Sequence, residues 1–208
     1  MRTLFERRSS SRPQWITSIV LVLLVPIVLI LMGRPVICET CCDTCDHVKL
    51  WQGDVFSSQV SQHLLDWYVF SHIIHGFLFY MIARYLFPKQ SVLFWAILAI
   101  IVEGAWEVLE NTPFVIEYYR NNTASTEFVG DTVINSTMDL LAMVVGFILA
   151  RKLPVWFTVL LFIGFELMTL YVIRDGFLLN VLMLLFSFGA VEEWQKQVAG
   201  MIVPPFLK

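Results

Sequence analysis

Apolar segments long enough to cross a lipid bilayer are the feature that most constrains the fold of this chain. A hydrocarbon core about 30 Å thick is crossed by about 20 residues of α-helix. The chain has 208 residues, of which 58% are hydrophobic, whereas a soluble domain is about 45–50% apolar. The sequence therefore predicts an all-α fold, a polytopic membrane helical bundle with six spans at residues 15–32, 68–87, 92–111, 132–150, 154–173 and 177–191.

The distribution of Lys and Arg predicts the orientation of these spans, because basic residues accumulate in cytoplasmic loops. With the N-terminus in the cytoplasm, the outer side carries only Arg34, Lys49, Arg120 and Arg174. The other basic residues fall on the cytoplasmic side: Arg2, Arg7, Arg8, Arg12, Arg84, Lys89, Arg151, Lys152, Lys196 and Lys208. We therefore expect both termini to lie in the cytoplasm.

This topology divides the chain into five parts. Residues 1–14 form a cytoplasmic tail, 15–32 a membrane anchor, 33–67 an outer loop, 68–191 a five-span membrane core, and 192–208 a second cytoplasmic tail. The anchor resembles a signal peptide in its basic start, but its apolar run is long and no small-residue cleavage site follows. The formal net charge is −3 and no basic patch is present, so nucleic acid is not an expected partner.

The outer loop carries all four cysteines of the chain, in two adjoining C-x-x-C units: Cys38, Cys41, Cys42 and Cys45. Four thiolates are a suitable ligand set for tetrahedral zinc. Disulfides are the commoner fate of cysteines outside the cytoplasm, and four cysteines allow more than one pairing. Both interpretations remain open. In either interpretation, the cysteines are expected to hold the loop together and not to form the active centre.

Histidines and acids interrupt the apolar spans, and the predicted topology places them all in the outer half of the bilayer. Ionisable side chains at membrane depth are costly and indicate a functional site by default. His72 and His75 share one face of the second span, and the third span carries Glu103, Glu107 and Glu110 on a single stripe. The remaining polar residues of the set are Asn111, Asp131, Asn135, Asp139 and Glu166.

Three interpretations of this cluster compete. Polar side chains can simply hydrogen-bond membrane helices together, although packing does not require three glutamates on one stripe. A second interpretation is a metal centre for Zn, Mn or Fe, and a third is metal-free acid–base chemistry. In both of these, the predicted centre consists of His72, His75, Glu107 and Asp139.

The other polar residues are predicted to bind and position a substrate. They are Glu103, Glu110, Asn111, Asp131 and Asn135, with Arg120 or Arg174 holding a lipid phosphate. The function expected from this set is a membrane-embedded enzyme acting on a lipid or lipid-linked headgroup at the outer face. A proton- or cation-coupled carrier is the alternative, although its polar residues should continue through the inner halves of the spans, which are apolar. A non-catalytic envelope assembly or binding factor is the third possibility.

Several longer runs resemble an uncharacterised family of proteobacterial multi-pass inner-membrane proteins, a domain of unknown function. The resemblance covers about residues 33–195 and implies a multi-pass protein of the bacterial inner membrane. The runs that carry it are Gly33-Arg34-Pro35, Val48-Lys-Leu-Trp51, Ser61-Gln-His-Leu-Leu-Asp-Trp-Tyr68, Ser71-His-Ile-Ile-His-Gly76, Glu103-Gly-Ala-Trp-Glu-Val-Leu-Glu-Asn111, Gly130-Asp-Thr-Val-Ile-Asn-Ser136 and Tyr171-Val-Ile-Arg-Asp175.

The layout of the polar residues also resembles, more loosely, that of VanZ-like membrane proteins. Such proteins carry an acid before a histidine, glutamates in the next span, and an acid-to-amide motif leading a later glycine-containing helix. The corresponding positions here are Asp66 and His72, Glu103 and Glu107, and Asp131 and Asn135 with Gly146. This likeness implies a role in envelope lipid or glycopeptide-tolerance biology, without supplying a reaction.

Overall fold

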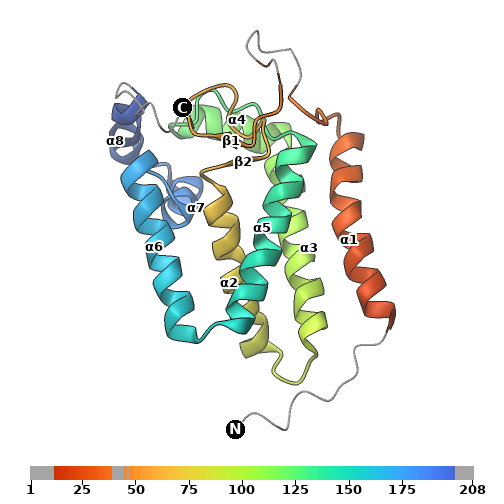
Figure 1. Cartoon of the computed structure of the whole chain (residues 1–208). Coiled ribbons are helices and arrows are strands. Elements are labelled where there is room, and N and C mark those ends of the chain that lie inside the picture. Colours follow the sequence, from red (N-terminus) through yellow and green to blue (C-terminus); the bar gives the residue numbers. More distant parts are fainter. Residues whose placement is uncertain (1–11, 39–44, 46, 200–208) are drawn as a thin grey trace.

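The computed structural model describes residues 12–38, 45 and 47–199, and nearly all of its regular structure is helical (Figure 1). The described elements are α1 (Arg12–Leu31), β1 (Trp51–Gln52), β2 (Leu65–Asp66), α2 (Val69–Leu86), α3 (Val92–Glu110), α4 (Pro113–Asn122), α5 (Val133–Lys152), α6 (Val155–Ile173), α7 (Phe177–Phe186) and α8 (Gly189–Ala199). The predicted all-α helical bundle is therefore confirmed.

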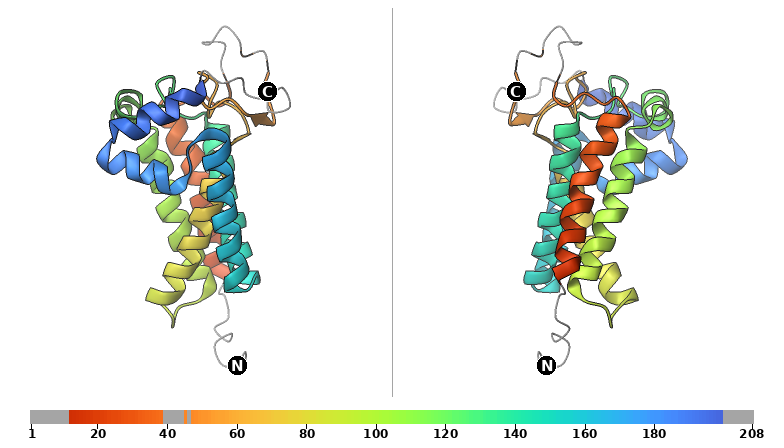
Figure 2. Two further views of the ribbon diagram at one scale, coloured as in Figure 1. Left: turned by 90° about the vertical axis from the view of Figure 1, so that its left-hand side faces the viewer. Right: turned by 90° about the vertical axis from the view of Figure 1, so that its right-hand side faces the viewer.

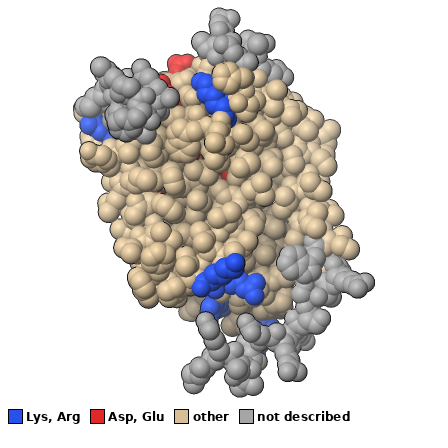
Figure 3. Space-filling view, viewed as in Figure 1, with Lys and Arg blue, Asp and Glu red and all other residues tan. Residues whose placement is uncertain are grey.

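The bundle consists of α1, α2, α3, α5 and α6, which run alongside one another (Figures 1 and 2). Four of these helices, α2, α3, α5 and α6, are long and apolar enough to cross a membrane, and α1 adds an apolar stretch over Ile16–Leu31. Large apolar side chains such as Val155 and Leu167 are exposed on the bundle. Figure 3 shows a broad surface band free of Lys and Arg between the two ends of the molecule. Such a surface suits contact with lipid chains.

The structure does not confirm the predicted sixth span. Helix α7 has 10 residues, which is about 15 Å of helix and half of the length that a bilayer core requires. It runs across the bundle axis, and the chain turns at Ser187 into α8 (Figure 2). The carboxylate of Glu166 on α6 accepts hydrogen bonds from the first amides of α7, Phe177 N at 2.8 Å and Leu178 N at 3.1 Å. This contact fixes the crosswise start of α7, a tertiary interaction that hydropathy does not reveal.

The expectation that both termini share one side is not supported by the arrangement of the helices next to them. Helix α1 starts at one end of the bundle and α8 lies at the other end (Figure 1). Because α7 does not cross the bundle, the chain stays at the end that α6 has reached. The terminal segments themselves, residues 1–11 and 200–208, lie outside the described residues.

Helices α2 and α5 approach each other closely through a pair of glycines. A Cβ atom on Gly76 would lie 2.1 Å from the carbonyl oxygen of Met143, and one on Gly146 would lie 2.0 Å from that of Ile73. Only glycine allows the two backbones this separation, as in other small-residue membrane helix contacts. The approach brings the first turns of α2 beside those of α5, where many of the predicted site residues lie.

The interior of the bundle changes character along its length. Below the polar residues the core is largely apolar, with Phe77 and Met143 at most 1% exposed. The polar residues occupy the end where α2 and α5 begin and α3 finishes. Residues 47–67 cover this end and include the short parallel pairing of β1 with β2 (Figure 1).

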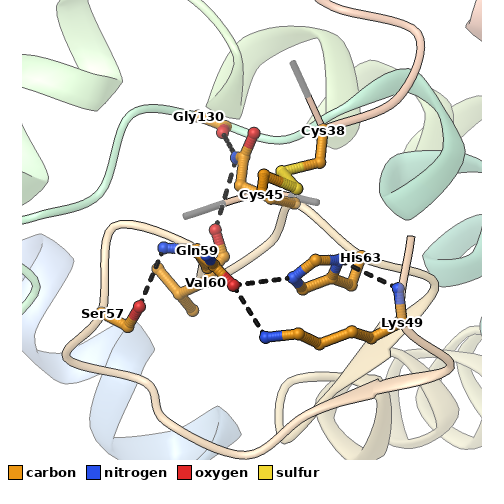
Figure 4. Close-up of a disulfide and its surroundings, with 9 residues drawn as sticks. Cys38, Cys45, Lys49, Ser57, Gln59, Val60, His63 and Gly130 are labelled. Atoms are coloured by element: carbon orange, nitrogen blue, oxygen red, sulfur yellow. Dashed lines mark hydrogen bonds between the residues drawn. A yellow bond between two sulfur atoms is a disulfide. The ribbon is translucent and has the colours of Figure 1, made fainter. Parts of the chain in front are cut away.

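A disulfide between Cys38 and Cys45 ties the start of the outer loop together (Figure 4). These two cysteines are therefore paired with each other and do not supply thiolates to zinc. Cys41 and Cys42 lie outside the described residues. Nearby, the backbone amide of Lys49 donates to Nδ1 of the buried His63 at 3.2 Å, and Nε2 of His63 bonds Gln59 Oε1 at 3.1 Å. Burial lowers the pKa of His63, which favours the neutral ring. Through these two hydrogen bonds His63 connects Lys49 to Gln59 within the loop.

The glycine contact predicts a large and local loss of stability on substitution. Gly146→Ala places a methyl group against the Ile73 carbonyl. We expect it to destabilise the bundle by about 1–3 kcal/mol, because the two helices must separate. The matched control is Gly164→Ala on α6, where a Cβ atom would meet nothing within 4 Å. Thermal unfolding of the detergent-solubilised protein measures both variants. Equal melting temperatures for the two variants would contradict the close approach.

Candidate functional site

Three helices bring the predicted site residues together at one end of the bundle. Helices α2 and α5 run away from this end and α3 runs toward it (Figure 1). His72 and His75 therefore lie in the first turns of α2, and Asp139 lies in the second turn of α5. Glu103 and Glu107 lie in the last turns of α3 and meet them from the opposite direction. Residues separated by up to 67 positions in the sequence thus form one cluster.

The carboxylate of Glu103 is shared by both histidines. Its Oε1 lies 2.6 Å from His72 Nδ1, and its Oε2 lies 2.9 Å from His75 Nδ1. Glu103 is fully buried, His72 is buried and His75 is partly buried. Donation from both Nδ1 atoms to Glu103 would fix the orientation of the rings and leave the two Nε2 atoms for other partners.

Two further carboxyl groups, those of Glu107 and Asp139, lie near His72, and three of their four oxygens have no hydrogen-bonding partner among the described residues. Glu107 Oε1 lies 3.6 Å from His72 Nδ1, and Asp139 Oδ2 lies 3.9 Å from His72 Nε2, both beyond hydrogen-bonding distance. Glu107 is 0% exposed and Asp139 is 4% exposed. Both oxygens of Glu107 and Oδ1 of Asp139 lack a hydrogen bond from any described residue. Such unsatisfied buried groups are costly and rare in native structures.

A second polar network holds Asp131 at the start of α5. Asn111, the C-cap residue of α3, donates from Nδ2 to Asp131 Oδ2 at 2.8 Å and accepts from Asp131 N at 2.7 Å. The hydroxyl of Ser136 adds a bond of 3.3 Å to the same carboxylate. Arg34 Nε donates to the backbone oxygen of Asp131 at 2.9 Å. Burial raises the pKa of Asp131, and its hydrogen bonds from Asn111 act in the opposite direction.

The outer loop contributes a third carboxylate network through Asp66. Its oxygens accept from the backbone amides of Ser61, at 3.2 Å, and Tyr68, at 2.8 Å. Burial raises the pKa of Asp66 to about 6 despite these bonds. Asn135 connects the loop to α5, because its Nδ2 donates to the His63 carbonyl at 3.0 Å, whereas its Oδ1 has no partner among the described residues.

A cavity of about 380 Å³ lies beside the cluster. Its polar lining includes five residues that the sequence singles out: His72, His75, Glu110, Asp131 and Asp139. Helix α7 supplies Phe177, Val181, Leu184 and Leu185, and α3 supplies Trp106 and Leu109. No Lys or Arg belongs to the lining formed by the described residues. The cavity therefore combines an acidic and imidazole-bearing side with an apolar side.

The two arginines predicted to hold a phosphate do not line this cavity. Arg120 Nε donates to the backbone oxygen of Thr126 at 3.3 Å. Arg174 donates to the Trp194 carbonyl at 2.7 Å, and its guanidinium lies 5.0 Å from the centre of the Trp194 ring. Both side chains are engaged with the protein, and Arg174 links the end of α6 to α8. Glu107 and Asn111 belong to the polar cluster, but neither lines the cavity.

Several cavity residues were not predicted from the sequence. Ser61, Tyr68, Trp106 and Asn180 all line the cavity. Trp106 lies within the Glu103–Asn111 run and Tyr68 follows Asp66 by two residues, so proximity to the acids was the available signal. Asn180 is on α7, and its place depends on the crosswise course of that helix. Its Oδ1 accepts from the hydroxyl of Tyr119 at 3.0 Å.

The fold and the cluster define a class of helical bundle protein: helices apolar enough to span a membrane enclose a histidine–carboxylate site beneath a structured loop. Residues 29–197 match the family described as "Protein of unknown function (DUF2585)", and the chain belongs to this family. It is 48% identical to a UPF0314 protein of Paracoccus denitrificans over 93% of this chain and 96% of that protein. It is 52% identical to a UPF0314 protein of Sinorhizobium fredii over 79% of this chain and 81% of that protein. No solved structure matches the chain.

Asp175, in the turn before α7, provides a test of the electrostatics at this end. It is buried, accepts from Gly176 N at 2.9 Å and from the Tyr68 hydroxyl at 3.2 Å, and burial raises its pKa to about 6. Because the folded state then holds the proton more tightly than the unfolded state, this group stabilises the fold at low pH. That stabilisation is lost as the pH rises from about 4 through about 6.

We expect Asp175→Asn to remove this part of the pH dependence. The melting temperature of the unmodified protein should fall relative to that of the variant between about pH 4 and about pH 7. Thermal unfolding in detergent across this range measures the difference. Glu117→Gln, an exposed change of the same type on α4, is the control. A parallel pH profile for the unmodified protein and Asp175→Asn would contradict the raised pKa.

Proposed function

We propose that this protein is a membrane-embedded enzyme that acts on a lipid or lipid-linked headgroup at the outer face of the bacterial inner membrane. The observation that carries the proposal is the two-sided cavity. Its apolar walls fit an acyl or isoprenoid chain, and its histidines and acids would contact the polar headgroup. An amphiphilic substrate matches both sides at once.

The mouth of the cavity supports entry from the lipid phase. Leu109 on α3 and Leu185 on α7 line the cavity and are also 50% and 67% exposed on the surface. Residues that are both lining and exposed mark the rim of an opening. Because this rim is apolar, it suits the entry of a lipid chain from a surrounding membrane.

The proposed acid–base group is His75. Its Nδ1 is held by Glu103, which leaves Nε2 to exchange a proton with a bound headgroup. The carboxyl groups of Glu110 and Asp131 also line the cavity, where they would bind hydroxyl or amino groups of the substrate. This arrangement, a base oriented by a buried carboxylate, is that used by many hydrolases and transferases.

The distribution of charge supports placing the site at the outer face. Arg84, Lys89, Arg151 and Lys152 are exposed at the opposite end of the bundle, where Figure 3 shows a group of Lys and Arg side chains. In the sequence, Arg2, Arg7, Arg8 and Arg12 precede or begin α1, which starts at this same end, and bring its basic residues to eight. The site end and the sequence after it carry six: Arg34, Lys49, Arg120, Arg174, Lys196 and Lys208. By the positive-inside rule, the end with the excess would face the cytoplasm. The cluster would then lie in the outer half of the membrane.

The apolar core argues against the alternative function, a proton- or cation-coupled carrier. A carrier needs polar groups or a cavity leading to the second side. Below the cluster the buried positions are held by residues such as Phe77 and Met143. The polar cluster and its cavity therefore lie at one end of the bundle only, which is the arrangement expected of an enzyme that acts at one face of the membrane. A purely structural assembly factor would not need the unsatisfied carboxylates.

The proposal is tested by the envelope lipids of a strain from which the gene is deleted. We expect one lipid class to accumulate and another to decline, and the native gene to reverse both changes. His75→Gln should reverse them at a rate reduced by about 100-fold or more, since general acid–base groups contribute about that much. His47→Gln, at an exposed histidine of the outer loop, should behave like the unmodified protein.

Lipid mass spectrometry, at equal membrane abundance of each variant, is the measurement. Unchanged lipids in the deletion strain under several growth conditions would argue against the enzyme. Unchanged lipids with altered proton or cation uptake would favour the carrier.

A further inference from the structure

The carboxyl groups of Glu107 and Asp139 are the least explained feature of the cluster. Both are more than nine-tenths buried, and three of their four oxygens receive no hydrogen bond from a described residue. Protonation would not satisfy them fully either, because the carbonyl oxygen of a neutral carboxyl group still needs a donor. The two groups come from different helices and lie beside the two nitrogens of one imidazole, Glu107 Oε1 3.6 Å from His72 Nδ1 and Asp139 Oδ2 3.9 Å from its Nε2. Two buried acids with unbonded oxygens beside one histidine point to a further bound partner at this position.

We propose that His72, Glu107 and Asp139 hold a divalent transition-metal ion. One ligand atom from each of these residues lies within 4.8 Å of the others. Ligand atoms around a tetrahedral ion at about 2.1 Å are about 3.4 Å apart. Bonding distance would therefore require separations of up to 4.8 Å to shorten by about 1.4 Å or less, which side-chain rotations can supply. Because Glu107 Oε1 lies 3.6 Å from Nδ1 of His72, its carboxyl group would have to turn toward the Nε2 side of the ring.

The environment of His72 matches that of a metal-bound imidazole. Such a histidine commonly presents one ring nitrogen to the metal and donates the other N–H to a carboxylate, which fixes its tautomer. Here Nδ1 lies 2.6 Å from Glu103, and Nε2 lies on the side of Asp139, at 3.9 Å from its Oδ2. Glu103 is thereby assigned as the outer partner of the site and not as a ligand.

A second group, His72, His75 and Glu103, also has three ligand atoms close together. Its carboxylate is already occupied by two imidazoles, at 2.6 and 2.9 Å. The group around Glu107 lacks such internal bonds, so it is the better ligand set. The proposed site therefore leaves His75 out, whereas the sequence-based prediction included both histidines as ligands.

The ligand set indicates the class of metal. One imidazole and two carboxylates form a borderline-to-hard site with a net negative charge, which suits Zn, Mn or Fe in the divalent state more than Ca²⁺ or Cu(I). His72 and Asp139 both line the cavity. An ion between them would have an open coordination position toward the cavity, as catalytic sites with three protein ligands do.

The test is the metal content of the full chain, purified in mild detergent without a histidine tag. We expect about one equivalent of Zn, Mn or Fe per chain. Glu107→Gln and Asp139→Asn preserve side-chain shape and remove a ligand, so each should weaken the site at least 10-fold after chelation and titration with Zn²⁺, Mn²⁺ or Fe²⁺. Asp175→Asn, the same change at a buried carboxyl outside the group, should retain the metal.

Gel filtration and thermal unfolding identify the variants that remain folded, and only these are compared. A Cys41→Ser, Cys42→Ser double variant should also retain the metal, since the proposed ligands exclude the outer loop. The proposal is overturned if the folded native protein binds none of the three metals above background. It is equally overturned if the metal survives in both ligand variants or is lost with the cysteines.

This site stands independently of the proposed lipid chemistry, and the two tests separate them. Metal bound by the expected ligands with unchanged envelope lipids would retain the site and reject the lipid enzyme. Altered envelope lipids together with a protein that binds no metal would reject the metal site and retain the lipid enzyme.

Discussion

The interaction on which this structure most depends is the sharing of one buried carboxylate, that of Glu103, by two imidazoles. A carboxylate removed from water is costly, and inside an apolar bundle it persists only with hydrogen-bonding partners. His72 and His75 supply them from the neighbouring helix. Because α3 and α2 must be in register for these bonds to form, the pair sets the relative height of the two helices and fixes both rings.

The second condition is the close approach of α2 and α5 at Gly76 and Gly146. Van der Waals packing, and not the hydrophobic effect, holds helices together in lipid, so small residues at a crossing are effective. Here the crossing has a chemical consequence as well. It brings Asp139 within 3.9 Å of His72, two residues whose helices would otherwise be separated by larger side chains. The apolar packing in the middle of the bundle thus positions the polar cluster at its end.

Sequence reasoning identified the long apolar helices, the polar end of the bundle and most of the clustered residues. These features depend on composition and on helical periodicity, which are local. It failed at α7, because length and hydropathy do not show that Glu166 caps a short crosswise helix. The predicted role of Arg120 or Arg174 in holding a phosphate stays a prediction; in the structure both donate to backbone carbonyls of the protein and neither lines the cavity. The partners of a long flexible side chain depend on the positions of distant segments, and no local pattern contains them.

The sequence by itself determined that this chain forms an apolar helical bundle with histidines and acids gathered at one end. Helical spacing places side chains on a face, and the alternating direction of the helices places those faces at a common height. Only the tertiary structure decided which of these groups pair and which do not. Glu103 and Glu107 lie one helical turn apart on the same stripe, yet the carboxylate of the first is bonded to two histidines and that of the second receives no hydrogen bond from a described residue. The difference arises because the position of α2, set by its packing on α5, puts both rings within hydrogen-bonding distance of Glu103, whereas Glu107 lies 3.6 Å from the nearer ring, that of His72.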